Sequence, residues 1–248
     1  MITDYNNISN KYKYTKTNPV KRYSEEFTFL QILGDINGKS VLDMACGDGY
    51  YSRLIKKLGA GQVTGVDISE KMIEKAQDIE RQSPQGIEYI VKDVSKPESI
   101  GLFDVIVAIY LFTYAKNSNS LISMCQEISN NLKSNGKFYA VTLNTNLSEK
   151  HMLTSSHYDA KMTLQGTLKN ASEIQIEIKT PYGGVNFSNY YWSRETYVKA
   201  LTKSGFKKII WHKALVSDDG INKYGKKYWQ EHLNNPGFEI IECFKSNS

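Results

Sequence analysis

Apolar and polar positions along the chain follow two alternating periods, which predict a regular series of strands and helices. Short buried-type runs predict strands at residues 40–45, 62–66, 87–91, 103–109 and 137–143, the last entered through a turn at 134–136. Helical patterns at 20–33, 50–58, 69–82 and 118–132 precede and separate these strands. Strands that alternate with helices favour a parallel sheet covered on both faces, a doubly wound α/β fold.

The rhythm changes after residue 145. Alternating stretches at 161–168 and 173–179 predict a β-hairpin, and a helix at 193–203 leads to two further strands at 206–213 and 238–244, an antiparallel pair at one sheet edge. We therefore expect a seven-stranded, mostly parallel, Rossmann-like sheet with a β-rich cap inserted after its fifth strand. The expected units are an N-terminal cover and helix (1–36), an α/β core (37–145), the inserted cap (146–190) and a C-terminal part that completes the sheet (191–248).

Composition and charge narrow the class of protein. The chain has 248 residues and a formal net charge of +5, which divides into about +2 for residues 1–39, −1 for 40–146 and +4 for 147–248. A basic excess spread this thinly favours a solvated surface over a nucleic-acid site. The longest apolar run has eight residues, which is too short to span a membrane, and the three cysteines have no metal-site or disulfide spacing. We expect a cytoplasmic protein with no nucleic-acid, membrane or metal partner.

The most informative segment follows the first predicted strand. Asp43 stands at the strand end, and Gly47 and Gly49 come before a helix, so that a ligand can approach the main chain closely. Asp67 ends the second strand, where a carboxylate can accept both hydroxyls of a ribose. Ser52 occupies the third position of the dinucleotide glycine pattern, which argues against an NAD enzyme.

These motifs are similar to those of class I S-adenosylmethionine-dependent methyltransferases. The likeness rests on Asp43-x-Ala45-x-Gly47-x-Gly49, Val66-Asp67-Ile68-Ser69, Lys92-Asp93-Val94 and Phe103-Asp104-Val105, in that order. It implies S-adenosylmethionine as cofactor, with S-adenosylhomocysteine as product. The cofactor-binding residues that it implies are Tyr14, Arg22, Asp43, Ala45, Gly47, Gly49, Asp67, Ile68, Met72, Asp93, Val94, Ala108 and Tyr110.

The C-terminal half resembles a narrower group, the toxoflavin-synthase-type N-methyltransferases. The matching segments are Tyr190-Tyr191-Trp192-Ser193-Arg194, Ser204-Gly205-Phe206, Trp211-His212-Lys213 and Tyr228-Trp229, whereas residues 145–189 match poorly. The likeness implies methyl transfer to a ring nitrogen of a small planar heterocycle of the azapteridine kind. An O- or C-methyltransferase acting on another small aromatic or quinone-like metabolite remains the alternative, followed by a non-catalytic cofactor-binding module.

Aromatic side chains suit a flat acceptor and a positively charged sulfur. The residues expected to face the acceptor are Tyr12, Tyr110, His157, Tyr191 and Trp192. Proximity and orientation supply most of the rate in such a transfer, and the sequence identifies no certain catalytic base. His212 and His232 are interpreted as structural. A monomer is the starting assumption, with a homodimer left open.

Overall fold

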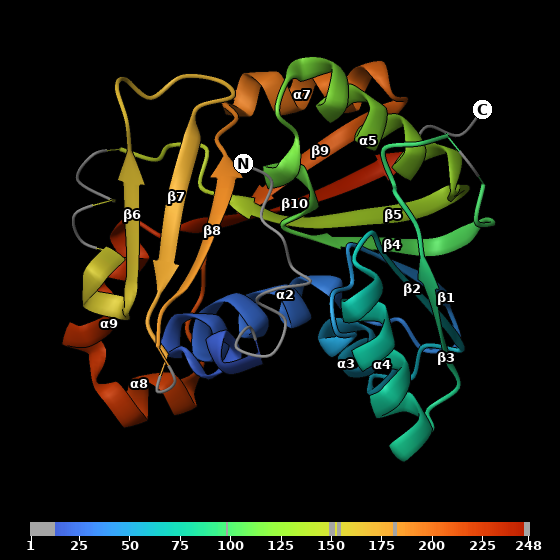
Figure 1. Cartoon of the computed structure of the whole chain (residues 1–248), viewed down its shortest axis with the longest axis horizontal. Helices are drawn as coiled ribbons and strands as arrows, with labels where there is room; N and C mark the ends of the chain where they lie inside the picture. The colour runs from blue at the N-terminus through green and yellow to red at the C-terminus, as the bar shows by residue number, and fades with distance from the viewer. Residues whose placement is uncertain (1–12, 98, 149–151, 153–154, 181–182, 246–248) are drawn as a thin grey trace.

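A seven-stranded sheet forms the centre of the molecule (Figure 1). The computed structural model describes residues 13–97, 99–148, 152, 155–180 and 183–245. In spatial order the strands are β3 (Ile87–Val91), β2 (Gln62–Asp67), β1 (Ser40–Met44), β4 (Phe103–Ile109), β5 (Leu132–Leu143), β10 (Phe238–Lys245) and β9 (Phe206–His212). Neighbours from β3 to β5 pair in parallel, and β10 runs antiparallel to both β5 and β9. The predicted sheet and its antiparallel edge are confirmed.

Helices cover both faces of this sheet because successive strand residues point to opposite sides. Val41 of β1 packs in one core with α2 (Glu26–Leu33), α3 (Tyr50–Lys57) and α4 (Glu70–Gln82). Leu42 packs in the other core with α5 (Ser118–Asn130) and α7 (Arg194–Lys203). Figure 1 shows these two helical layers below and above the sheet. As predicted, Ser69 begins α4, and its side chain accepts a hydrogen bond from the Met72 N–H.

A second, three-stranded antiparallel sheet follows β5 and stands beside the main sheet (Figure 1). Its strands are β6 (Ala160–Leu164), β7 (Glu173–Ile178) and β8 (Val185–Tyr190), and the short helix η4 (Ser155–Tyr158) precedes them. The predicted hairpin corresponds to β6 and β7. The third strand, β8, was not expected, because its polar residues at 186, 188 and 189 hide the usual alternation.

Three further details differ from the prediction. Residues 134–136 lie inside β5 rather than in a turn. The pairing of β5 with β4 shifts register there, so these residues have no partner in β4. The preceding helix ends at Asn130, two residues early. Two short helices, α8 (Asp218–Tyr224) and α9 (Lys226–Asn234), fill a segment for which no element was expected. Gly225 separates them with a φ of 79°, a conformation that suits glycine.

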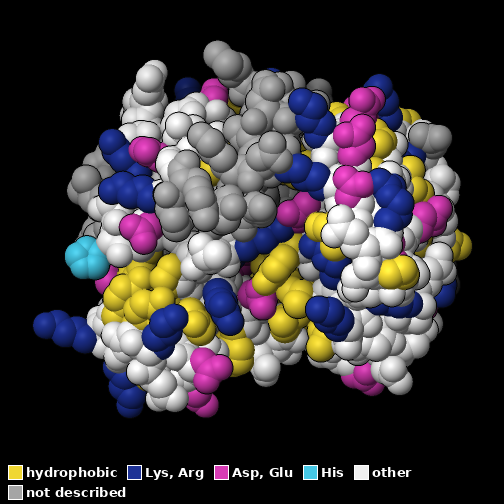
Figure 2. Space-filling view, turned by 60° about the horizontal axis from the view of Figure 1, so that its bottom comes forward, with side chains coloured by type: hydrophobic (Ala, Val, Ile, Leu, Met, Phe, Trp, Pro, Cys, Tyr) yellow, Lys and Arg dark blue, Asp and Glu magenta, His cyan; other side chains and the backbone are white. Residues whose placement is uncertain are grey.

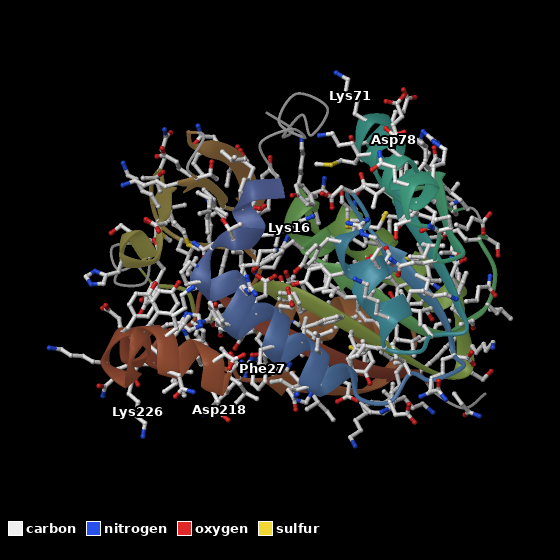
Figure 3. All side chains as sticks on the ribbon, turned by 90° about the horizontal axis from the view of Figure 1, so that it is seen from below. Lys16, Phe27, Lys71, Asp78, Asp218 and Lys226 are labelled. Carbon is white, nitrogen blue, oxygen red and sulfur yellow. The ribbon has the colours of Figure 1, made fainter. Side chains whose placement is uncertain are left out.

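The N-terminal segment crosses the molecule. It contains a 3₁₀ turn, η1 (Lys13–Thr17), and a short π-helix, η2 (Lys21–Glu25), which continues into α2. In Figure 3 the labels Lys16 and Phe27 mark this segment between α8 and α9 on one side and α3 and α4 on the other. Its side chains contact both parts, because Lys16 pairs with Asp48 before α3 and Ser24 is hydrogen-bonded to His232 of α9.

Charged side chains of both signs are interspersed over the face drawn in Figure 2. Within the described residues, no helix has the length and apolar character needed to cross a membrane. The same residues contain no cluster of three or more histidine, cysteine, aspartate or glutamate side chains arranged to hold a metal ion.

Candidate active site

The loop after β1 is shaped by residues with positive φ. Ala45, Gly47 and Gly49 have φ values of 63°, 57° and 75°. A Cβ atom on Gly49 would lie 2.3 Å from the Tyr89 hydroxyl oxygen, so only glycine fits there. The Cys46 N–H donates to the Val66 carbonyl at 2.9 Å, which ties the loop to β2. The loop therefore turns tightly at the carboxyl end of the sheet, next to the point where β1 separates β2 from β4.

Asp67 joins this loop to the start of α4. Its Oδ2 accepts the Gly47 N–H at 2.8 Å, and its Oδ1 accepts the Ser69 N–H at 2.9 Å. Burial raises the pKa of this carboxyl. Each carboxylate oxygen can accept a second hydrogen bond, so Asp67 retains acceptor capacity toward the hydroxyls of a ligand.

Asp43 lies behind the loop and is 1% exposed. The Ser52 hydroxyl donates to its Oδ2 at 2.6 Å, whereas Oδ1 is buried without a hydrogen-bond partner among the described residues. Burial raises the pKa of this carboxyl to about 7. A buried acceptor without a donor is costly, and a cationic ligand group nearby would favour the ionised form.

A cavity of about 350 Å³, here called the first cavity, opens beside this loop. Ile68, on its wall, is 67% exposed and offers an apolar surface that a ligand could cover. The walls combine carboxylates with apolar surface. The lining residues include Ala45, Gly47, Asp67, Ile68, Met72, Asp93, Val94, Tyr110 and Tyr114.

Eight of the residues expected to bind the cofactor line this first cavity, and four others with described side chains do not. Asp43 and Ala108 are buried in β1 and β4, and Gly49 stands directly before α3. Arg22 is exposed, with its guanidinium 5.6 Å from the centre of the Tyr23 ring, because the polar face of the N-terminal helical segment carries it outward. Tyr14 lies in η1, and its side chain is outside the described part of the structure.

A second cavity, of about 140 Å³, lies between the N-terminal segment, the three-stranded sheet and α9. Tyr110 and Tyr114 line both cavities and therefore form the boundary between them. The rest of the lining is mainly apolar and aromatic, with a few polar groups. It includes Asn18, Lys21, Glu25, Leu143, Tyr158, Met162, Ile176, Phe187, Asn189, His232 and Phe238.

Strand β8 borders both cavities through its alternation. Phe187 and Asn189 line the second cavity, and Ser188 and Tyr190 line the first. Asn189 is 2% exposed, and its Oδ1 has no hydrogen-bond partner among the described residues. The second cavity thus presents a buried acceptor that a ligand N–H or O–H group could satisfy.

Tyr110 belongs to a buried polar network. Its hydroxyl donates to Glu25 Oε2 at 2.5 Å, while Glu25 Oε1 accepts from Lys21 Nζ at 3.0 Å and from the Tyr51 hydroxyl at 2.9 Å. Tyr110 has a φ of 63°, an uncommon conformation for a bulky residue. Lys21 and Glu25 were not predicted, because their four-residue spacing in a helix is also typical of a surface ion pair.

His232 lines the second cavity and is 3% exposed. Burial lowers its pKa to about 4, so the ring is neutral near pH 7. Its Nε2 lies 2.8 Å from the Ser24 hydroxyl, which itself donates to the Leu215 carbonyl at 2.6 Å. Nε2 therefore carries the hydrogen and donates it to Ser24. The structural role expected for His232 is consistent with this bond, but its place on a cavity wall was not expected.

The residues expected to face the acceptor are distributed differently from the expectation. Tyr110 lines both cavities, and Tyr12 lies outside the described residues. His157 is exposed on η4, beside Tyr158. Tyr191 donates to the Thr145 carbonyl at 2.6 Å, and Trp192 donates to the Ala115 carbonyl at 3.1 Å. These backbone bonds hold Tyr191 and Trp192 in the core, so neither ring lines a cavity.

Part of the chain is similar in sequence to methyltransferases. Residues 41–136 match a family model described as a methyltransferase domain. An uncharacterized protein of Haemophilus influenzae is 31% identical over 169 residues, which cover 64% of this chain and 62% of that protein. A ubiquinone biosynthesis O-methyltransferase of Shewanella halifaxensis is 30% identical over 140 residues, or 55% and 58% of the two chains. The chain therefore spans about six-tenths of the length of these relatives.

Solved structures share the fold over nearly the whole chain. An S-adenosylmethionine-dependent methyltransferase from Mesorhizobium loti superimposes with a TM-score of 0.65 at 18% identity, covering 93% of this chain and all of that one. A structure described as a DhpI-SAH complex gives a TM-score of 0.61 at 17% identity, covering 98% and 94%. Residues 41–136 are thus similar to a methyltransferase domain, and the solved structures show that the fold is shared; the closeness to toxoflavin-synthase-type enzymes stays a prediction.

Proposed function

We propose that the chain is an S-adenosylmethionine-dependent methyltransferase that acts on a small, flat, largely apolar acceptor. The observation that carries this proposal is the meeting of two cavities at Tyr110 and Tyr114. One cavity has the carboxylates and apolar walls that suit a nucleoside cofactor, and the other is mainly apolar and aromatic. When bound, the cofactor would supply a methyl group already activated by its positive sulfur.

The residues around the first cavity fit this cofactor. Asp67 would accept the ribose hydroxyls, Ile68 and Met72 would pack on the adenine, and Asp93 would accept from the adenine amino group. Asp43, whose Oδ1 has no partner among the described residues, would attract the amino-acid ammonium across the loop. These residues bind and orient the cofactor, and none of them needs to exchange a proton during methyl transfer.

The protein would accelerate the reaction mainly by orientation. Holding the acceptor atom in line with the methyl group contributes on the order of 7–11 kcal/mol in well-oriented systems. The walls of the second cavity exclude water and restrict a planar molecule, with Tyr110, Tyr158 and Phe187 as aromatic surfaces. A ring nitrogen of a heterocycle is the proposed acceptor atom. A phenolic oxygen is the alternative acceptor atom, because one relative is named a ubiquinone biosynthesis O-methyltransferase.

Mass spectrometry of products tests this function. The protein is incubated with S-adenosylmethionine and a panel of pteridines, azapteridines, azoles and phenols, and each acceptor is examined for a mass increase of one methylene group. Methylation of an N–H heterocycle supports the proposal, and methylation of phenols alone would replace it by the oxygen alternative. Binding of S-adenosylhomocysteine without turnover of any acceptor would instead indicate a cofactor-binding module.

A further inference from the structure

Tyr110 combines three features that its role as a wall does not require. It lies at the boundary of the two cavities, it has a φ of 63°, and its hydroxyl is only 2.5 Å from Glu25 Oε2. A positive φ in a bulky residue is strained and is found preferentially at functional sites. The hydroxyl of this residue is also bonded to a buried carboxylate.

The direction of this hydrogen bond is fixed by chemistry. An ionised carboxylate only accepts, so the single hydroxyl hydrogen of Tyr110 points at Glu25. The phenol oxygen can then accept a hydrogen bond from an N–H or O–H group of a ligand in the second cavity. Donating a hydrogen bond to a charged carboxylate also makes the Tyr110 oxygen more electron-rich. Tyr110 is therefore arranged to receive a proton from an acceptor molecule and to pass its own to Glu25.

The charges around Glu25 suit this role. Glu25 is 3% exposed and lies against Lys21 and the Tyr51 hydroxyl, and neutral His232 lines the same cavity and is hydrogen-bonded to the neighbouring Ser24. Lys21 also lies 5.6 Å from the centre of the Tyr110 ring. Lys21 and Glu25 together carry no net charge. The pair can therefore take up one positive charge at the moment when the charge on the cofactor sulfur disappears.

We propose that Tyr110 and Glu25 form a proton relay that deprotonates the acceptor during methyl transfer. This inference rests on the proposed methyltransferase function. The acceptor N–H or O–H proton moves to the Tyr110 oxygen, and the Tyr110 proton moves to Glu25 Oε2. The lone pair left on the acceptor forms the new bond to the methyl carbon, and the electron pair of the broken carbon–sulfur bond stays on sulfur. The proton leaves Glu25 for solvent after product release.

Two variants remove the relay with little change of shape, Tyr110→Phe and Glu25→Gln. The acceptors are phthalimide, whose single ring nitrogen is largely protonated near pH 7.5 and has no free lone pair until it loses its proton, and 5-phenyl-1H-tetrazole, which is already ionised there. With the protonated acceptor we expect each variant to lower kcat by about 100-fold or more, the usual contribution of a positioned base. With the ionised acceptor we expect less than about a threefold change. The double variant should lose no more than either single variant, because the two groups act as one unit.

Tyr139→Phe and Glu242→Gln provide matched controls. Tyr139 donates to Glu242 at 3.4 Å, and this buried tyrosine–glutamate pair lies outside both cavities. These controls should keep wild-type kcat with both acceptors. The Kd of Glu25→Gln for S-adenosylhomocysteine, measured by calorimetry, should stay within about twofold of the wild-type value. The log kcat of Glu25→Gln with the protonated acceptor should rise with pH as that acceptor ionises in solution.

Three results would overturn the relay. The first is a kcat within threefold of wild type for both relay variants with phthalimide. The second is an equal loss with both acceptors, which would show that the network only supports the shape of the site. The third is a wild-type protein that binds S-adenosylhomocysteine but methylates no acceptor, in which case the proposed function fails and the relay fails with it.

Discussion

Replacing Asp67 by alanine tests the cofactor site most sharply. The carboxylate now holds the N–H groups of Gly47 and Ser69 at 2.8 and 2.9 Å, and it is expected to accept the ribose hydroxyls as well. A hydrogen bond to a charged group contributes about 1.5–3 kcal/mol. At 1.4 kcal/mol for each tenfold change, loss of one such bond to the cofactor raises Kd by roughly 10- to 150-fold.

Calorimetric titration with S-adenosylhomocysteine measures this change without an acceptor. Asp78→Ala is the control, because Asp78 lies on α4 at the edge of the molecule and its side chain is 55% exposed (Figure 3). We expect the control to bind like wild type. Asp67→Asn keeps the shape and tests the charge, and it should fall between wild type and Asp67→Ala. A Kd within twofold of wild type for a folded Asp67→Ala protein would refute the assignment of the ribose site.

Three other predictions concern the folded state. Gly49→Ala should lower the free energy of unfolding by about 1–3 kcal/mol more than Gly86→Ala, because both have a φ of 75° but only Gly49 faces a neighbour, the Tyr89 hydroxyl. Equal losses in urea unfolding would contradict this reasoning. Burial raises the pKa of Asp43 to about 7, against 3.8 for the unfolded chain, so Asp43 ionises at a lower pH in the unfolded chain than in the folded protein. The free energy of unfolding should therefore fall as pH rises from 4 to 7, and Asp43→Asn should remove up to about 4 kcal/mol of that dependence. The same dependence of unfolding free energy on pH in wild type and Asp43→Asn would be evidence against a raised pKa at Asp43. Burial lowers the pKa of His232 to about 4, against 6.5 for the unfolded chain, so the free energy of unfolding should fall by up to about 3 kcal/mol as pH falls from 6.5 to 4. His232→Gln should abolish this loss, and the same dependence on acid pH in that variant would contradict the prediction.

The sequence was most informative where chemistry depends on local order. Gly47, Gly49 and Asp67 follow the ends of neighbouring strands, and parallel strands bring their carboxyl ends together. Their positions in the chain therefore predict a shared site, and Gly47 and Asp67 do meet in the structure. Glycine-rich turns can also be predicted from the sequence, because few other residues adopt their backbone conformation.

The second cavity depends on long-range packing, which the sequence pattern did not reveal. Glu25 meets Tyr110 across 85 positions, and neither the helix around Glu25 nor the strand before Tyr110 indicates the contact. Tyr191 and Trp192 were expected to face the acceptor, but nearby backbone carbonyls hold both rings in the core. An aromatic residue is equally suited to a core and to a cavity, so periodicity alone does not separate the two.

A crystal structure with S-adenosylhomocysteine bound tests the central claim most directly. We expect the ribose hydroxyls on Asp67, the adenine against Ile68, and the sulfur beside Tyr110, open toward the second cavity. A ribose away from Asp67, or a sulfur closed off from the second cavity, would contradict the account.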